Sequence, residues 1–135
     1  MLIMVDMING FIKEGALSSP LIEDIIEPIK QLISSCNEVD IPVIAFVDSH
    51  TENSAEFSSY PIHCIEDTSE SEIVEDLIND SNYIIIKKNS TNGFIEKVFQ
   101  EKLITNPQIN TFVVVGCCTD ICVMQFCLTL KTYFN

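Results

Sequence analysis

The clearest chemical signal in the sequence is a cysteine just beyond an apolar segment that ends in glycine. Val113–Gly116 runs into the turn Cys117–Asp120, and Cys122 follows. We expect a strand, a turn and a helix here, with Thr119 or Asp120 capping the helix. Cys122 would then lie in the first helical turn, where unpaired N–H groups and the helix dipole favour a thiolate. A nucleophile at such a strand–turn–helix junction is typical of enzymes that transfer acyl groups. Taken alone, Cys122 is equally well interpreted as a small buried structural residue.

Other polar side chains follow the remaining apolar segments. Asp6 ends the first segment, Asp48 ends the second, and Lys88 follows the third. A thiol nucleophile needs a base and an orienting charge, which a carboxylate and an ammonium can supply. Both histidines, His50 and His63, lie instead in the loop after the second segment, among acidic residues. Taken singly, these aspartates and the lysine are as easily turn caps or solvated strand ends.

Four apolar segments of strand length must position these groups. They do not alternate with polar residues, which is typical of a parallel sheet covered on both faces. The segments are Leu2–Asp6, Pro42–Asp48, Tyr83–Lys87 and Thr111–Gly116. Apolar stripes at helical spacing separate and follow them, at 21–33, 73–78, 94–103 and 122–130. The alternation predicts an α/β fold with a doubly wound, mainly parallel sheet and helices on both faces.

Two loops leave the same edge of this expected sheet and are unusually long. They are Met7–Ser19 and Ser49–Glu70. Long loops in a compact domain are usually functional, and ligands of open parallel sheets lie beyond the carboxyl ends of the strands. We therefore expect the reactive residues to converge on that edge.

Composition narrows the class of protein further. The 135 residues are the length of one domain, 1–135, and 47% of them are hydrophobic, which excludes a disordered chain. A net charge of −13 disfavours nucleic acid and anionic membranes as partners. No apolar run approaches the ~20 residues of a membrane helix, and the N-terminus lacks a secretory signal, so we expect a cytoplasmic protein. The 6 cysteines include no Cys-x-x-Cys pair and are expected to be free thiols, with Cys127 in the core.

The sequence resembles the isochorismatase-like cysteine hydrolases, and among them most closely the nicotinamidase branch. The resemblance spans the chain and rests on four blocks: Val5–Phe11 with Gly15–Leu17, Asp48–His50 with Tyr60–Cys64, Lys88–Phe94, and Gly116–Val123. It implies the isochorismatase-like form of the α/β fold described above.

The resemblance also implies a catalytic triad. Cys122 matches the nucleophile, and Asp6 matches the base that takes its proton and later protonates the leaving ammonia. Lys88 matches the third member of the triad, whose positive charge holds the aspartate and the cysteine together. Lys87 is adjacent, but the spacing to Phe94 favours Lys88.

Backbone and aromatic groups would complete the expected site. The resemblance implies an oxyanion hole made of the N–H groups of Cys118 and Cys122, with a cis peptide bond between Cys117 and Cys118. Phe11 and Tyr60 match aromatic residues that enclose the substrate ring, and Tyr60 replaces a common tryptophan.

The second long loop would hold a divalent metal ion. Asp48, His50, Glu56 and His63 form a set of oxygen and nitrogen ligands that suits zinc, iron or manganese. We expect one ion, most simply zinc, that contacts the ring nitrogen of the substrate. A solvated acidic loop is the plain alternative.

The resemblance therefore implies a nicotinamidase that acts on a small amide in NAD salvage. Two alternatives remain open: a metal-independent amidase of the same fold that acts on carbamoyl or ureido compounds, and a non-catalytic domain. Family members continue with another strand and helix beyond the point where this chain stops, at Asn135. We therefore expect the C-terminal strand–helix unit to be missing and one sheet edge to be open, which a second copy of the chain could cover.

Overall fold

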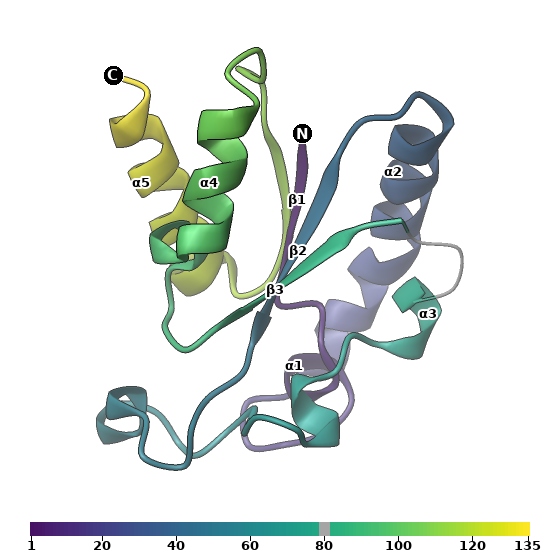
Figure 1. The fold of residues 1–135 in the computed structure, drawn as a ribbon. Coiled ribbons are helices and arrows are strands. Elements are labelled where there is room, and N and C mark those ends of the chain that lie inside the picture. Colours follow the sequence, from purple (N-terminus) through teal and green to yellow (C-terminus); the bar gives the residue numbers. More distant parts are fainter. Residues whose placement is uncertain (79–81) are drawn as a thin grey trace.

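A computed structural model describes residues 1–78 and 82–135 and contains a four-stranded parallel sheet (Figure 1). The strand order is β3-β2-β1-β4, and every pairing between neighbours is parallel. The strands are β1 (Leu2–Val5), β2 (Val43–Asp48), β3 (Ile84–Lys88) and β4 (Val113–Gly116). The expected α/β fold with a parallel sheet is confirmed, and the strand ends differ from the expected ones by one or two residues.

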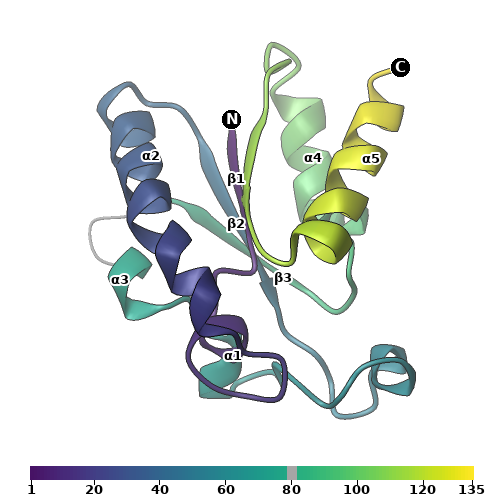
Figure 2. The ribbon, with the colours of Figure 1, turned by 180° about the vertical axis from the view of Figure 1, so that it is seen from behind.

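Helices cover both faces of the sheet. The α-helices are α1 (Asn9–Ile12), α2 (Ile26–Glu38), α3 (Glu75–Ile78), α4 (Lys97–Thr105) and α5 (Met124–Tyr133). α4 and α5 lie on one side of the sheet, and α2 and α3 lie on the other (Figures 1 and 2). Each layer buries its own apolar cluster against the sheet, which is the arrangement expected for a doubly wound fold.

The two central strands differ from the two outer ones in burial. β1 and β2 are buried along their whole length. On β3, Ile84 and Ile85 are 38% and 54% exposed, and on β4, Val113 is 49% exposed. Helices therefore cover both faces of the sheet as expected, but they leave exposed parts of β3 and β4, which form the two edges of the sheet in the described part of the chain.

All four expected helices begin later than their apolar stripes, and the difference is largest for α2 and α4. Residues Pro20–Ile25 and Gly93–Ile95 form 3₁₀ turns that precede α2 and α4. Leu21 and Ile95 are exposed as a result, and the apolar faces of the helices begin at Ile26 and Phe99. Proline at the first position of the Pro20–Ile25 turn fits this geometry, because its missing N–H needs no partner there.

Aromatic packing fixes the segment that follows β3. The Phe46 ring lies 5.3 Å from the Phe99 and Phe126 rings, measured between centroids. Gly93 lies so close to Phe46 that an added Cβ would come within 2.6 Å of the ring. This close approach, which requires glycine, holds the chain after Lys88 down onto the sheet.

The carboxyl ends of the strands form one edge, as the sequence predicts. Asp48 at the end of β2 pairs in register with Lys88 at the end of β3. Val5 pairs with Phe46 of β2 and with Gly116 of β4, so Asp6 follows at the same level. Gly116 has φ +122°, and a Cβ there would lie 1.9 Å from the Val5 carbonyl oxygen, so the start of the cysteine turn requires glycine.

Candidate active site

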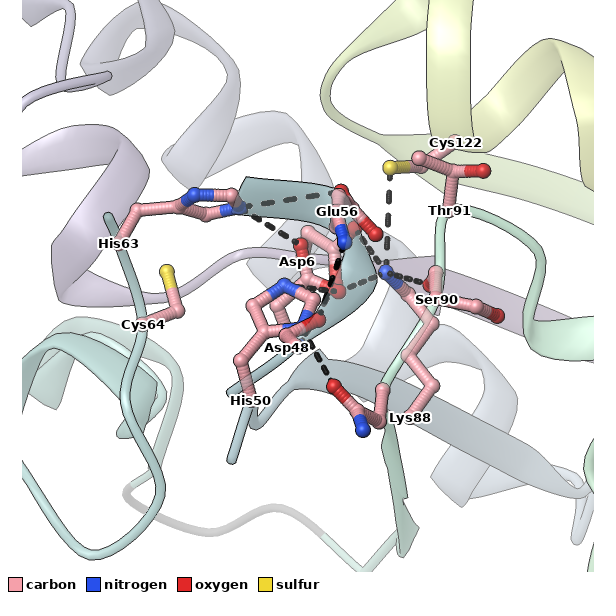
Figure 3. A network of polar contacts seen from close by, with 12 residues as sticks. Asp6, Asp48, His50, Glu56, His63, Cys64, Lys88, Ser90, Thr91 and Cys122 are labelled. Atoms are coloured by element: carbon pink, nitrogen blue, oxygen red, sulfur yellow. Dashed lines mark hydrogen bonds and ion pairs between the residues drawn. The ribbon is translucent and has the colours of Figure 1, made fainter. Parts of the chain in front are cut away.

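Lys88 is the centre of a buried polar cluster (Figure 3). Its Nζ lies 2.8 Å from Asp6 Oδ2 and also donates a short hydrogen bond to Asp48 Oδ1. The same ammonium donates to the Ser90 carbonyl oxygen at 3.2 Å and to Cys122 Sγ at 3.8 Å. The structure thus brings Asp6, Lys88 and Cys122 together, and Lys87 points away to an exposed ion pair with Asp67.

The two aspartates of the cluster differ in their affinity for a proton. Burial and the nearby charge of Asp48 raise the pKa of Asp6 to about 7, although Lys88 opposes the shift. Burial would also raise the pKa of Asp48, but the neighbouring His50 and the positive charge of Lys88 outweigh it and lower that pKa. Asp6 is therefore the carboxylate that can exchange a proton near neutral pH, which is what a general acid–base group must do.

The surroundings of Cys122 favour the neutral thiol, whereas its place near a helix start favours a thiolate. Burial raises the pKa of the Cys122 thiol, and the negative charge of Asp6 raises it further. The residue lies in a π-helical turn, Thr119–Val123, and is 4% exposed. A carboxylate oxygen of Asp6 lies within 4.8 Å of the Cys122 sulfur, so a group that can accept the thiol proton is close by. Loss of solvation and the negative charge of Asp6 therefore outweigh the preference for a thiolate near a helix start.

The turn before Cys122 has the unusual peptide that the resemblance implies. The bond between Cys117 and Cys118 is cis. The Cys117 thiol donates a hydrogen bond to the Asp6 carbonyl oxygen at 3.1 Å, which ties this turn to the end of β1. Asp6 itself has φ +54°, a conformation that non-glycine residues seldom adopt, so the contacts around it hold its backbone in place.

The four predicted metal ligands meet beside the lysine cluster. One donor atom from each of Asp48, His50, Glu56 and His63 lies within 4.8 Å of the others. His63 Nε2 is 3.9 Å from both Asp48 Oδ2 and Glu56 Oε1, and His50 Nε2 is 3.6 Å from Asp48 Oδ1. In the described part of the chain, His50 Nε2 and Asp48 Oδ2 are buried atoms without a hydrogen-bond partner. Buried lone pairs that face one another fit a bound cation, and nitrogen with carboxylate oxygen suits zinc.

A small cavity of about 130 Å³ lies between the thiol and the possible metal ligands. Phe11 and Tyr60, the two predicted ring-contacting residues, are both in its wall, and Cys118 and Cys122 line it as well. Sequence reasoning missed three further wall residues, Leu17, Thr91 and Ile121. A larger hollow of about 500 Å³ lies beside β3, but none of the residues proposed for chemistry lines it.

Comparison with known proteins identifies the family. The family model of the Isochorismatase domain matches residues 1–132, so the chain belongs to this family. Nicotinamidase 1 of Arabidopsis thaliana is 34% identical over a 150-residue alignment that covers 99% of this chain and 61% of the plant protein. The chain thus spans less than two thirds of that relative.

Solved structures share the fold. N-carbamoylsarcosine amidase from Thermoplasma acidophilum matches with a TM-score of 0.87 and 26% identity, over 95% of this chain and 73% of that one. Pyrazinamidase of Pyrococcus horikoshii in complex with zinc matches with a TM-score of 0.84 and 29% identity, over 97% and 77%. Among the described residues, the helices are all too short or too polar to cross a membrane.

Proposed function

We propose that this protein is an amidase that hydrolyses nicotinamide to nicotinate and ammonia through a thioester on Cys122. The observation that carries the proposal is the meeting of two clusters at one cavity. Cys122, which belongs to the cluster with Asp6 and Lys88, lines this cavity. Three members of the proposed metal set, Asp48, Glu56 and His63, line it as well. A cavity of about 130 Å³ suits a single-ring amide. The similarity to a plant nicotinamidase and to a zinc-containing pyrazinamidase supports the same substrate class.

Asp48, His50, Glu56 and His63 would hold one divalent ion, for which we propose zinc. When bound, such an ion supplies a Lewis acid that can accept the ring nitrogen of the substrate and so set the position of the amide. Phe11 and Tyr60 would pack against the ring, since both line the cavity near His63. The ring would then lie with its amide carbon toward Cys122.

The first half of the reaction requires Asp6 as a base. Burial and Asp6 raise the pKa of the Cys122 thiol, so its proton would pass to Asp6 as the sulfur attacks the amide carbon. Lys88 contacts both side chains, and its positive charge compensates the thiolate that forms. The backbone N–H groups of Cys118 and Cys122 would stabilise the oxyanion of the tetrahedral intermediate.

The second half of the reaction returns the proton. Asp6, now protonated, gives its proton to the departing nitrogen, and ammonia leaves as the C–N bond breaks. Water then attacks the thioester while Asp6 takes a proton from it. The C–S bond breaks, Asp6 returns that proton to the Cys122 sulfur, and the acid leaves as nicotinate after losing its carboxyl proton to solvent. A pKa of about 7 suits Asp6 for both directions of transfer. The product nicotinate would serve pyridine nucleotide salvage.

Ammonia release separates this proposal from the two alternatives. We expect release from nicotinamide, loss of that activity after chelation, and recovery when zinc is restored, while benzamide, which lacks the ring nitrogen, reacts poorly. Cys122→Ala should remove the activity, and Cys127→Ala should keep it. Equal activity on nicotinamide with and without chelator, or activity on N-carbamoyl compounds only, would favour the metal-independent amidase. Release from neither class of substrate would favour a non-catalytic domain.

A further inference from the structure

We propose that Asn89 is a positioning residue for the metal site, because its amide oxygen sets which nitrogen of His50 faces the ion. The inference rests on the proposed metal set and adds a residue outside it. Asn89 is not a ligand in that set, and its sequence context gives no reason to connect it with a histidine 39 residues earlier.

The contact between the two side chains is direct. Asn89 Oδ1 lies 2.8 Å from His50 Nδ1. An amide oxygen can only accept a hydrogen bond, so Nδ1 must carry the hydrogen, and in neutral imidazole the lone pair is then on Nε2. Nε2 is the buried atom that lies 3.6 Å from Asp48 Oδ1 and has no hydrogen-bond partner among the described residues. Asn89 therefore selects the tautomer that a metal requires.

Ser54 does not set the tautomer by itself. Its hydroxyl lies 3.4 Å from the same His50 Nδ1, a longer contact than that of Asn89. A hydroxyl can donate or accept, so it is compatible with either tautomer. The Ser54 oxygen also accepts a hydrogen bond from the Glu56 N–H at 3.4 Å. Only the amide oxygen of Asn89 demands a hydrogen on Nδ1.

The other histidine is oriented in a different way. His63 Nδ1 donates to the Pro61 carbonyl oxygen at 2.7 Å, a contact within its own loop. His50 instead depends on a side chain from the end of another strand. Lys88, the residue before Asn89, pairs in register with Asp48, and its carbonyl oxygen accepts from the Ser49 N–H at 2.9 Å. The end of β3 therefore places both the lysine of the thiol cluster and the residue that orients a metal ligand.

The first test is the zinc affinity of the protein. It is measured on metal-free protein by competition with a chromophoric chelator. Asn89→Ala should bind zinc about 10- to 100-fold more weakly, the usual loss when the partner of a ligating histidine is removed. Asn89→Asp keeps an acceptor and should restore the affinity. Asn53 is an exposed asparagine three residues from His50 and provides the matched controls. Asn53→Ala controls for the loss of a side chain and Asn53→Asp for the added charge, and each should change the zinc affinity by less than about threefold. Thermal unfolding of the metal-free variants checks that each is folded.

The tautomer itself gives the second test and needs neither metal nor activity. Imidazole ¹⁵N chemical shifts of the metal-free protein, recorded where His50 is neutral, should show hydrogen on Nδ1 in the parent protein. Asn89→Ala should shift His50 toward hydrogen on Nε2, and Asn53→Ala should not. Unchanged zinc affinity and unchanged shifts in Asn89→Ala would overturn the role of Asn89 alone. Failure of the parent protein to bind zinc would overturn the proposed metal set as well.

Discussion

The ammonium of Lys88 lies 2.8 Å from Asp6 Oδ2, and the side chains of both residues are fully shielded from solvent. The same ammonium bonds Asp48, so one cation balances two buried carboxylates. Asp6 lies within 4.8 Å of the Cys122 sulfur, and Asp48 belongs to the proposed metal set. Lys88 therefore links the two halves of the candidate site, and its removal should affect more than the proposed chemistry.

Lys88→Met should be strongly destabilising in the metal-free protein. Methionine fills a similar volume but leaves Asp6 and Asp48 buried without a cation, and breaking a buried pair typically costs about 3–5 kcal/mol. We expect a loss of that order in the free energy of unfolding, measured by urea denaturation with a chelator present. Lys87→Met is the matched control, because its partner Asp67 is 86% exposed at the side chain and such a pair contributes about 0–1 kcal/mol. Equal losses in the two variants would contradict the central role of Lys88.

Asp6→Asn should remove turnover while the protein stays folded. Asparagine has nearly the same shape and can still accept a hydrogen bond from the Asp48 N–H, which lies 3.0 Å from Asp6 Oδ1. It has no carboxylate to take the thiol proton, so ammonia release should fall by about 10²- to 10⁴-fold, the range for general acid–base groups. Asp67→Asn, at an exposed position, should retain the parent rate. Substantial turnover in Asp6→Asn would exclude Asp6 as the base.

The raised pKa of Asp6 predicts a specific dependence of rate on pH. The attacking step needs the carboxylate form, which is present above the pKa and lost below it. With a pKa of about 7, kcat/KM for nicotinamide should rise as the pH increases from about 5.5 and level off above about 8. Zinc content measured at each pH distinguishes this effect from metal loss in acid. A kcat/KM that stays constant across this window at full zinc content would show that Asp6 does not act as proposed.

The sequence was sufficient to predict that Asp6, Asp48 and Lys88 lie together. Each follows an apolar segment, and the carboxyl ends of parallel strands share one edge, so convergence follows from topology alone. It was not sufficient for Leu17 and Ile121, which line the cavity, because an apolar side chain beside a ligand has the same sequence pattern as one in the core.

The raised pKa of Cys122 also could not be predicted from the sequence. Local pattern put the residue near a helix start, where a thiolate is favoured, but the state of the thiol depends on burial and on Asp6, which reaches it from the other end of the chain. Exposure of β3 was missed for a related reason, since which strand forms an edge depends on strand order and not on strand composition.

The two cysteines that face the cavity should differ in reactivity in the resting protein. The neighbouring Cys117 side chain lowers the pKa of Cys118, whereas burial and Asp6 raise the pKa of Cys122. Alkylation requires the thiolate, so iodoacetamide near pH 7 should label Cys118 before Cys122, as peptide mapping by mass spectrometry can follow. In Asp6→Asn, which lacks the negative charge, labelling of Cys122 should become faster. Preferential labelling of Cys122 in the parent protein would instead restore the helix-start interpretation.

Glu56 provides the sharpest test of the metal set, because a matched glutamate lies four residues earlier. Glu56 Oε1 is 3.9 Å from His63 Nε2 and within the cluster of four donors, whereas Glu52 is exposed and outside that cluster. Glu56→Gln replaces an anionic ligand with a neutral amide and should weaken zinc binding by about tenfold or more, at least the loss seen when a supporting residue is removed. Glu52→Gln removes the same charge from the same loop and should leave zinc affinity within about twofold. If both variants lose affinity equally, general attraction of the acidic loop for cations would explain the binding, and Glu56 would have to be removed from the set. Nicotinamide turnover should follow zinc occupancy in Glu56→Gln and recover at high zinc, since the thiol cluster around Lys88 is unchanged.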